Sequence, residues 1–93
     1  MSNLAMKCYY LQVFAGDIPV SISAVKNEKF FFRTVSQAIY NQLIGVHYMT
    51  RLHDAGIILE SNNIPESFLG TIIPFVYQNR KLEMRVYPQV LAM

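Results

Sequence analysis

Two histidines and an aspartate form the one cluster in this chain whose residue types and spacing suggest catalysis or metal binding. They are His47, His53 and Asp54. We expect a helix across this region, and residues six apart on a helix point in directions about 240° apart. The two imidazoles therefore cannot hold one metal ion as an i, i+4 pair would, and we predict no metal site. His47 and Asp54 do share a helix face, which keeps a small enzyme as a third hypothesis, although a solvated polar stripe is the commoner origin of such a pattern.

The other residues that carry chemistry are too few or too scattered for an active site. Cys8 is the only cysteine, so no internal disulfide can form. It lies in a strongly apolar segment, where a thiol is usually a small, unreactive hydrophobic group. The four glycines are far apart in the sequence, so there is no glycine-rich phosphate loop. We therefore predict no catalytic residue and no cofactor.

Two small groups of basic residues remain. We expect the first before the helix and the second at a C-terminal hairpin: Lys26, Lys29 and Arg33, then Arg80, Lys81 and Arg85. With neighbouring aromatic side chains, they could bind single-stranded nucleic acid through charge and stacking. Solvated turn residues and charges that protect strands from aggregation are commoner, and the formal net charge is only +2. Nucleic-acid binding is therefore an alternative that we do not favour.

The composition points to a protein partner. Eight Lys or Arg and six Asp or Glu make up 15% of the chain, against about 25% in an ordinary soluble domain. Interface cores are poor in charge but keep their aromatic residues and methionines. The shortage is concentrated in residues 4–25 and 64–76, which hold only three charged side chains. We expect the interface there.

Length and hydropathy limit the class of protein further. Ninety-three residues are enough for one domain, which we take to be residues 1–93. The N-terminus lacks a basic region followed by a continuous apolar run, and no stretch approaches 18 apolar residues. We therefore expect a cytoplasmic protein that neither is secreted nor associates with a membrane.

Two hairpins are predicted from the apolar pattern. Residues 4–14 are almost continuously apolar, which predicts a strand covered on both faces, and residues 18–25 alternate as a half-buried strand does. A turn at residues 15–17 joins the two. Residues 71–77 and 82–87 form the second predicted hairpin, with a turn at 78–81.

The segment between the hairpins predicts one long helix. Thr34 and Gln37 have capping-box spacing, and apolar residues recur at three- and four-residue steps from Val35 to Leu52. Gly56 is expected to end the helix, which at about 20 residues would be near 30 Å long. The three phenylalanines at 30–32 predict either a short strand or the approach to the helix, and residues 64–67 a single helical turn.

Together these elements predict an α+β two-layer sandwich. An antiparallel sheet of four to five strands, in the order ββαββ, would carry one long amphipathic helix across one face. The opposite face would expose more apolar surface than monomers usually show, so it requires a partner. The expected interface side chains belong to the predicted strands: Tyr9, Leu11, Val13, Ile18, Val20, Ile22, Ile73, Phe75 and Tyr77.

The sequence therefore favours a non-enzymatic module that binds a protein target stoichiometrically, and we expect a homodimer. A small inhibitor, an immunity or antitoxin-like protein, or a phage or mobile-element factor needs only such a shaped surface. A secretion chaperone or assembly adaptor is the alternative within the same class. The fold alone does not choose among them.

Overall fold

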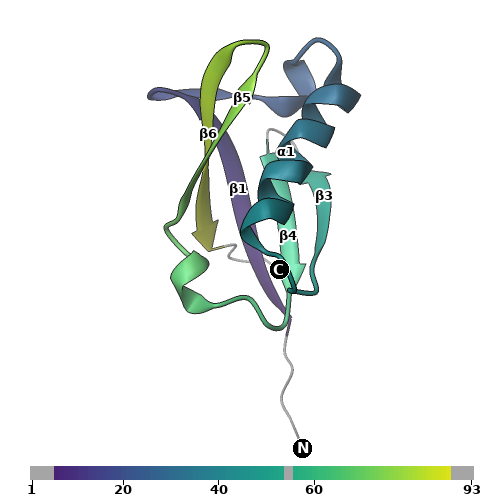
Figure 1. The fold of residues 1–93 in the computed structure, drawn as a ribbon, viewed down its shortest axis with the longest axis vertical. Helices are drawn as coiled ribbons and strands as arrows, with labels where there is room; N and C mark the ends of the chain where they lie inside the picture. The colour runs from purple at the N-terminus through teal and green to yellow at the C-terminus, as the bar shows by residue number, and fades with distance from the viewer. Residues whose placement is uncertain (1–5, 54–55, 89–93) are drawn as a thin grey trace, which may run out of the picture.

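A computed structural model describes residues 6–53 and 56–88 as six strands and one α-helix (Figure 1). Two single turns of 3-10 helix also occur, η1 (Ile22–Ala24) and η2 (Glu66–Phe68). The strands and helix follow one another as β1 (Lys7–Ala15), β2 (Ile18–Val20), α1 (Glu28–Gln42), β3 (Met49–His53), β4 (Gly56–Ser61), β5 (Ile72–Tyr77) and β6 (Arg80–Pro88).

The strands form one antiparallel sheet in the spatial order β3-β4-β1-β6-β5. β1 lies at its centre and pairs with β6 along one side. On the other side it pairs first with β4 and then, over its last three residues, with β2. The α+β class is thus confirmed, but the count of four to five strands is wrong. The chain order is two strands, a helix and four strands rather than ββαββ.

The helix begins earlier than the sequence pattern indicated. α1 starts at Glu28 and contains all three phenylalanines at 30–32, so neither a strand nor a lead-in occurs there. Its buried stripe runs at four-residue steps through Phe31, Val35 and Ile39 and continues to Leu43 just beyond its end. That spacing keeps one face of a helix against the sheet.

The predicted capping box is wrong, because Thr34 lies inside the helix. Its hydroxyl donates a hydrogen bond of 3.1 Å to the carbonyl of Phe30, one turn earlier. The N-cap is Asn27, in the left-handed conformation with φ 60° and without a side-chain capping bond. Asn is a residue type favoured at N-caps, but here its side chain does not bond to the first turn, so no side-chain capping bond fixes the start of α1.

The second half of the expected helix is not helical. Gly45 has φ +82° and lies in the loop that follows α1, and residues 49–53 form strand β3. Gly56 opens β4 instead of ending a helix, and the short apolar run at 57–59 is buried strand within the sheet. Within the described part of the chain, no helix is long and apolar enough to cross a membrane.

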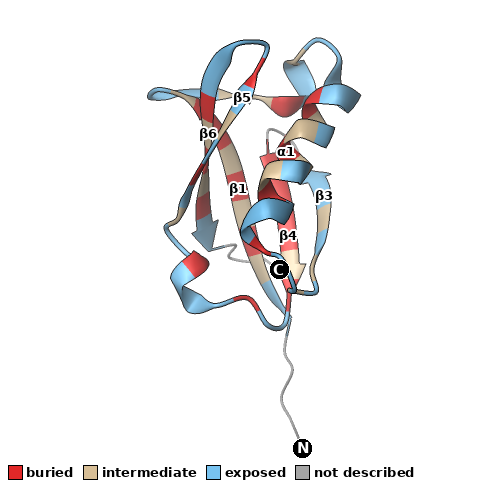
Figure 2. Cartoon of the chain, viewed as in Figure 1, coloured by how far each residue is buried: buried red, intermediate tan, exposed pale blue. Residues whose placement is uncertain are grey.

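The sheet has one face packed against α1 and one that no described helix covers. Along β1, buried residues alternate with half-buried ones (Figure 2). Tyr9, Leu11 and Val13 face the core, whereas Tyr10 and Gln12 face the other way. β1 is therefore fully covered on one face only, not on both as expected.

Both predicted hairpins are present. β5 and β6 are joined by Gln78 and Asn79, with φ 51° and 64°, the left-handed pair that matches the twist of a two-residue hairpin. The first hairpin pairs β1 with β2, but β2 ends at Val20. The rest of the expected second strand is occupied by η1, and the turn predicted near 64–67 is found as η2.

Candidate binding groove

β5 is an outer strand of the sheet, and one of its long edges is free of any strand in residues 6–53 and 56–88. Within these residues it pairs with β6 alone, in a register that sets Tyr77 opposite Arg80 beside the two-residue turn. Hydrogen-bonded and non-bonded pairs alternate in an antiparallel ladder, and the pair that closes such a turn is a bonded one. The backbone groups of Ile72, Pro74 and Val76 therefore face away from β6.

A hydrogen bond at the far end of the hairpin agrees with this assignment of bonded and non-bonded pairs. The N–H of Val86 donates to the carbonyl of Thr71 at 3.2 Å, so the bonded pairs of this hairpin fall on odd-numbered positions of the β5 segment. Pro74 lacks an N–H. It occupies a position whose backbone groups do not hydrogen-bond to β6, which is where proline is tolerated in an edge strand.

The strand itself carries no charge. Its burial alternates, with Ile73 and Tyr77 in the core and their neighbours exposed. Ile72 is 54% exposed and Val76 60%. Edge strands of stable proteins are usually protected by charges, bulges or proline, and here Pro74 is the one such device within β5. An uncharged, apolar free edge of this kind is suited to pairing with another chain.

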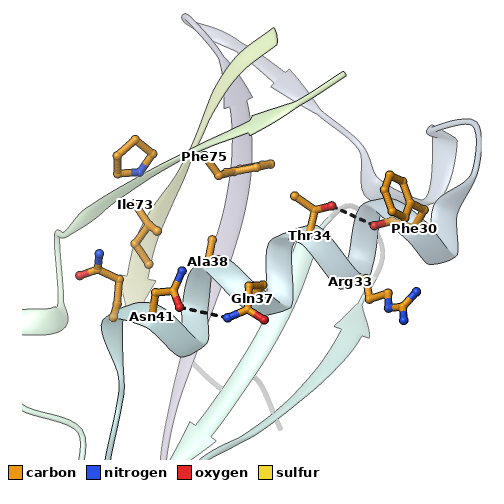
Figure 3. A pocket seen from close by; sticks show the side chains of 10 residues that line it. Phe30, Arg33, Thr34, Gln37, Ala38, Asn41, Ile73 and Phe75 are labelled. Atoms are coloured by element: carbon orange, nitrogen blue, oxygen red, sulfur yellow. Dashed lines mark hydrogen bonds between the residues drawn. The ribbon is translucent and has the colours of Figure 1, made fainter. Parts of the chain in front are cut away.

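A groove of about 520 Å³ runs between β5 and α1. Ile73 and Phe75 extend from the strand toward Ala38 on the helix (Figure 3). The lining side chains come from the exposed side of α1 and from the middle of β5: Phe30, Arg33, Thr34, Gln37, Ala38, Asn41, Gln42, Ile73, Pro74 and Phe75. One wall is thus apolar strand and the other is mostly polar helix.

The polar wall keeps hydrogen-bonding capacity for a ligand. Gln37 Nε2 donates to Asn41 Oδ1 at 3.0 Å, which holds both amides along the helix (Figure 3). This bond leaves the Gln37 carbonyl oxygen as an acceptor and the Asn41 amide nitrogen as a donor. Among the described residues of the lining, Arg33 is the one with a charge, and none carries a carboxylate.

Aromatic packing brings the start of α1 to the end of β5. The Tyr77 ring centroid lies 5.8 Å from that of Phe30 and 4.7 Å from that of Phe31. Since Arg80 is the cross-strand neighbour of Tyr77, the start of α1 and the start of β6 lie at the same end of the molecule, and each carries basic residues. We call this the basic end and define it by Lys26, Lys29, Arg33, Arg80 and Lys81.

Arg85, the sixth basic residue singled out in the sequence, is engaged elsewhere. Its guanidinium lies 3.8 Å above the ring centroid of Phe14, donates to Glu83 Oε2 at 2.8 Å and to the carbonyl of Gly16 at 2.9 Å. The hydrogen bond to Glu83 raises the pKa of Arg85, so its charge is fixed. This side chain covers an aromatic ring on the sheet rather than offering a charge to a ligand.

Six of the nine expected interface residues lie in the core and face α1 or pack beneath it. These are Tyr9, Leu11, Val13, Ile22, Ile73 and Tyr77. Of the other three, Ile18 is exposed, whereas Val20 and Phe75 are half-buried. The exposed apolar positions of β5 are Ile72 and Val76, which the sequence reasoning missed. Every residue of β5 is uncharged, so the pattern alone does not show which alternate set faces outward.

The histidine cluster does not assemble as expected. His47 is exposed in the loop before β3, and its carbonyl accepts a hydrogen bond from the Ser61 hydroxyl. His53 ends β3, and Asp54 lies outside the described residues. The prediction that His47 and Asp54 share a helix face is therefore wrong, because residues 49–53 between them form a strand. In residues 6–53 and 56–88, no three His, Cys, Asp or Glu side chains gather as a metal site would require.

Cys8 is not activated as a nucleophile. Its thiol is half-buried on β1 and donates to Glu60 Oε2 at 3.5 Å. Burial, together with the hydrogen bond and the negative charge of Glu60, raises the pKa of Cys8 above its ordinary value. A raised pKa lowers the thiolate fraction near neutral pH, which is the opposite of what a reactive cysteine needs.

The groove and the basic end are therefore the features of the described surface from which a function can be argued. No protein-family model, curated protein or solved structure matches this chain. We therefore infer the function from the geometry of β5 and α1.

Proposed function

We propose that this protein is a non-enzymatic binding module that takes up an extended segment of a partner protein along β5. The observation that carries the proposal is the free, uncharged edge of β5 beside the groove against α1. In strand addition, main-chain hydrogen bonds supply affinity, and pockets for alternate side chains supply specificity. The free edge of β5 offers the main-chain hydrogen bonds, and the groove offers the side-chain pockets.

The ladder available to the partner is short but well defined. Ile72 and Val76 each present an outward N–H and carbonyl, and Pro74 presents a carbonyl between them. One side of an added strand would face the groove, where Ile73, Phe75 and Ala38 accept an apolar side chain. The other side would continue the uncovered sheet face beside Ile72 and Val76, and so bury apolar surface that is now exposed.

Pro74 favours a different chain over a second copy of this one at the β5 edge. A partner strand meets one missing N–H at Pro74. Two copies paired antiparallel about Pro74 would lose two hydrogen bonds at the centre of the interface. We therefore assign β5 to a heterologous partner and any homodimer to the uncovered sheet face, where Tyr87 is exposed.

Selection from a library of random peptides displayed on phage tests the proposal. We expect the wild-type protein to enrich extended, β-prone peptides. The charge introduced by Val76→Lys or Ile72→Lys should abolish their binding. Met49→Lys is the matched control, because Met49 is 63% exposed on β3 at the opposite edge. Failure to enrich peptides, or equal binding to Val76→Lys and the wild type, would contradict the proposal.

Nucleic-acid binding is the second candidate, favoured by the convergence of five cations at the basic end. Two of the three aromatic rings at this end, Phe31 and Tyr77, are buried and cannot stack on bases, whereas Phe30 is exposed. This candidate predicts binding of fluorescein-labelled oligothymidylate that weakens steeply with salt and is lost on joint Arg80→Ala and Lys81→Ala substitution. With Phe30 as the one exposed ring of these three, stacking on bases has little support, and this makes nucleic-acid binding the weaker proposal.

A further inference from the structure

We infer that the segment taken up along β5 is an apolar stretch with acidic residues at the end that lies against the basic end of the molecule. This inference deepens the proposed function and rests on it. It names the chemistry of the partner, which strand addition alone leaves open because main-chain hydrogen bonds are the same for any sequence.

The charges along the groove are of one sign. Arg33 lines it, and no Asp or Glu is among the lining residues that the structure describes. At the Tyr77 end of the groove, Arg80 lies opposite Tyr77 on β6, and Lys29 lies one turn before Arg33 on the helix. A strand added along β5 would therefore have cations near its end beside Tyr77, with Arg33 and Lys29 on α1 and Arg80 across β5.

These cations are not neutralised by neighbouring side chains in the described part of the chain. Arg33, Arg80 and Lys81 form no ion pair there, whereas Arg85 lies 2.8 Å from Glu83 and 3.6 Å from Asp17. The one acidic residue in the first turn of α1 is Glu28. Unpaired like charges gathered at one end of a groove raise the local concentration of an oppositely charged partner and set its orientation.

The other end of the groove is neutral. Asn41 and Gln42 line it on the helix and Ile73 on the strand. Here the free amide groups of Gln37 and Asn41 can bond to a polar group, and the apolar wall accepts an aliphatic side chain. The contrast between a neutral end and a basic end gives the bound segment a direction, with its carboxylates toward Arg33 and Arg80.

The test uses one peptide obtained from the display selection, made synthetically with a fluorescein label and titrated by fluorescence anisotropy. We expect selected peptides to combine an apolar stretch with Asp or Glu on one flank. Replacing those acids by Asn or Gln should weaken binding about fivefold or more at 50 mM NaCl, and by less at 500 mM, because salt screens surface charge.

Charge reversal on the protein completes the test. Arg33→Glu and Arg80→Glu should each weaken binding of the peptide about fivefold or more. Arg51→Glu should leave its binding unchanged, because Arg51 is exposed on β3 at the opposite edge. Circular dichroism melting of each variant checks that the fold is retained. These positions are exposed, so the variants are expected to fold.

The outcomes separate this inference from the proposed function. Peptides without an excess of acids, or binding unaffected by Arg33→Glu and Arg80→Glu, would overturn the inference, while loss of binding in Val76→Lys would still support strand addition. Absence of selected peptides, or binding insensitive to Val76→Lys, would overturn both. Tight binding of oligothymidylate that competes with the peptide and is lost in Arg80→Glu would show that the basic end serves a nucleic acid instead.

Discussion

At the residue scale, Tyr77 carries an unsatisfied polar group. Its hydroxyl is buried and has no hydrogen-bond partner among the described residues, although its ring packs against Phe30 and Phe31. A buried unpaired hydroxyl costs about 1–3 kcal/mol, and removal of the hydroxyl relieves that cost while the ring contacts stay. We expect Tyr77→Phe to raise the free energy of unfolding by about 1 kcal/mol in urea denaturation.

The control is Tyr40→Phe. Tyr40 is 52% exposed, so loss of its hydroxyl should change stability by less than about 0.5 kcal/mol. A clear loss of stability in Tyr77→Phe would show that the hydroxyl makes a bond in the native protein.

Gly56 is required by a close approach within the sheet. A Cβ at this position would lie 2.5 Å from the Leu11 carbonyl oxygen and 2.7 Å from two atoms of the Tyr10 side chain. The backbone oxygen cannot move aside cheaply, so we expect Gly56→Ala to cost about 1–3 kcal/mol by overpacking. Gly45→Ala is the comparison, since its Cβ would enter open space and the cost is limited to its positive φ. Thermal melting should rank Gly56→Ala as the less stable.

The reactivity of Cys8 follows from its environment. Burial first, and then the hydrogen bond and charge of Glu60, raise the pKa of Cys8 above its ordinary value. The thiol should therefore react slowly near neutral pH with a disulfide reagent such as DTNB, and faster as the pH rises. Glu60→Gln removes the negative charge, lowers the pKa of Cys8 and should increase the rate at pH 8. An unchanged or slower rate would contradict this assignment.

At the element scale, the start of α1 is the sharpest difference between expectation and structure. Because Thr34 lies inside the helix, Thr34→Ala removes no cap and replaces a residue of modest helix propensity. We expect the free energy of unfolding to change by less than about 0.5 kcal/mol, whereas loss of an N-cap costs about 1 kcal/mol. Chemical denaturation distinguishes the two values, and a loss of 1 kcal/mol or more would place the helix start near Thr34.

The hairpins could be predicted from sequence because their turns and alternation are local signals. The helix boundaries could not. A Thr and a Gln three residues apart also occur inside helices, and the true N-cap, Asn27, makes no side-chain capping bond. Between Val46 and Leu52, apolar residues three apart satisfy a helical period, although Gly45 adopts a left-handed conformation and the chain then continues as β3. Tertiary pairing of β3 with β4 decided the structure there.

The candidate site was only partly predictable for a related reason. The uncharged segment that contains β5 was identified from composition, but β5 is apolar at every position, so its outward phase depends on the register with β6. The convergence of two basic groups depends on contacts between Tyr77 and α1, which join residues far apart in the sequence. No local pattern carries that information.

At the scale of the whole molecule, the shortage of charge has a specific location. The chain is 15% charged, and the fold places an uncharged strand at one edge of the sheet, with cations that form no ion pair among the described residues near its Tyr77 end. The opposite edge strand, β3, carries Arg51 and His53. The two edges therefore differ in chemistry, and this difference is why we assign the partner to β5.

Amide hydrogen exchange of the ¹⁵N-labelled protein, with and without a selected peptide, tests the central claim most directly. Strand addition to β5 predicts that the N–H groups of Ile72 and Val76 gain protection, because they face away from β6 and would bond to the added strand. Amides of β3 should exchange as before. Protection gained on β3, or none gained on β5 by a peptide that binds, would contradict the assignment of β5 as the binding edge.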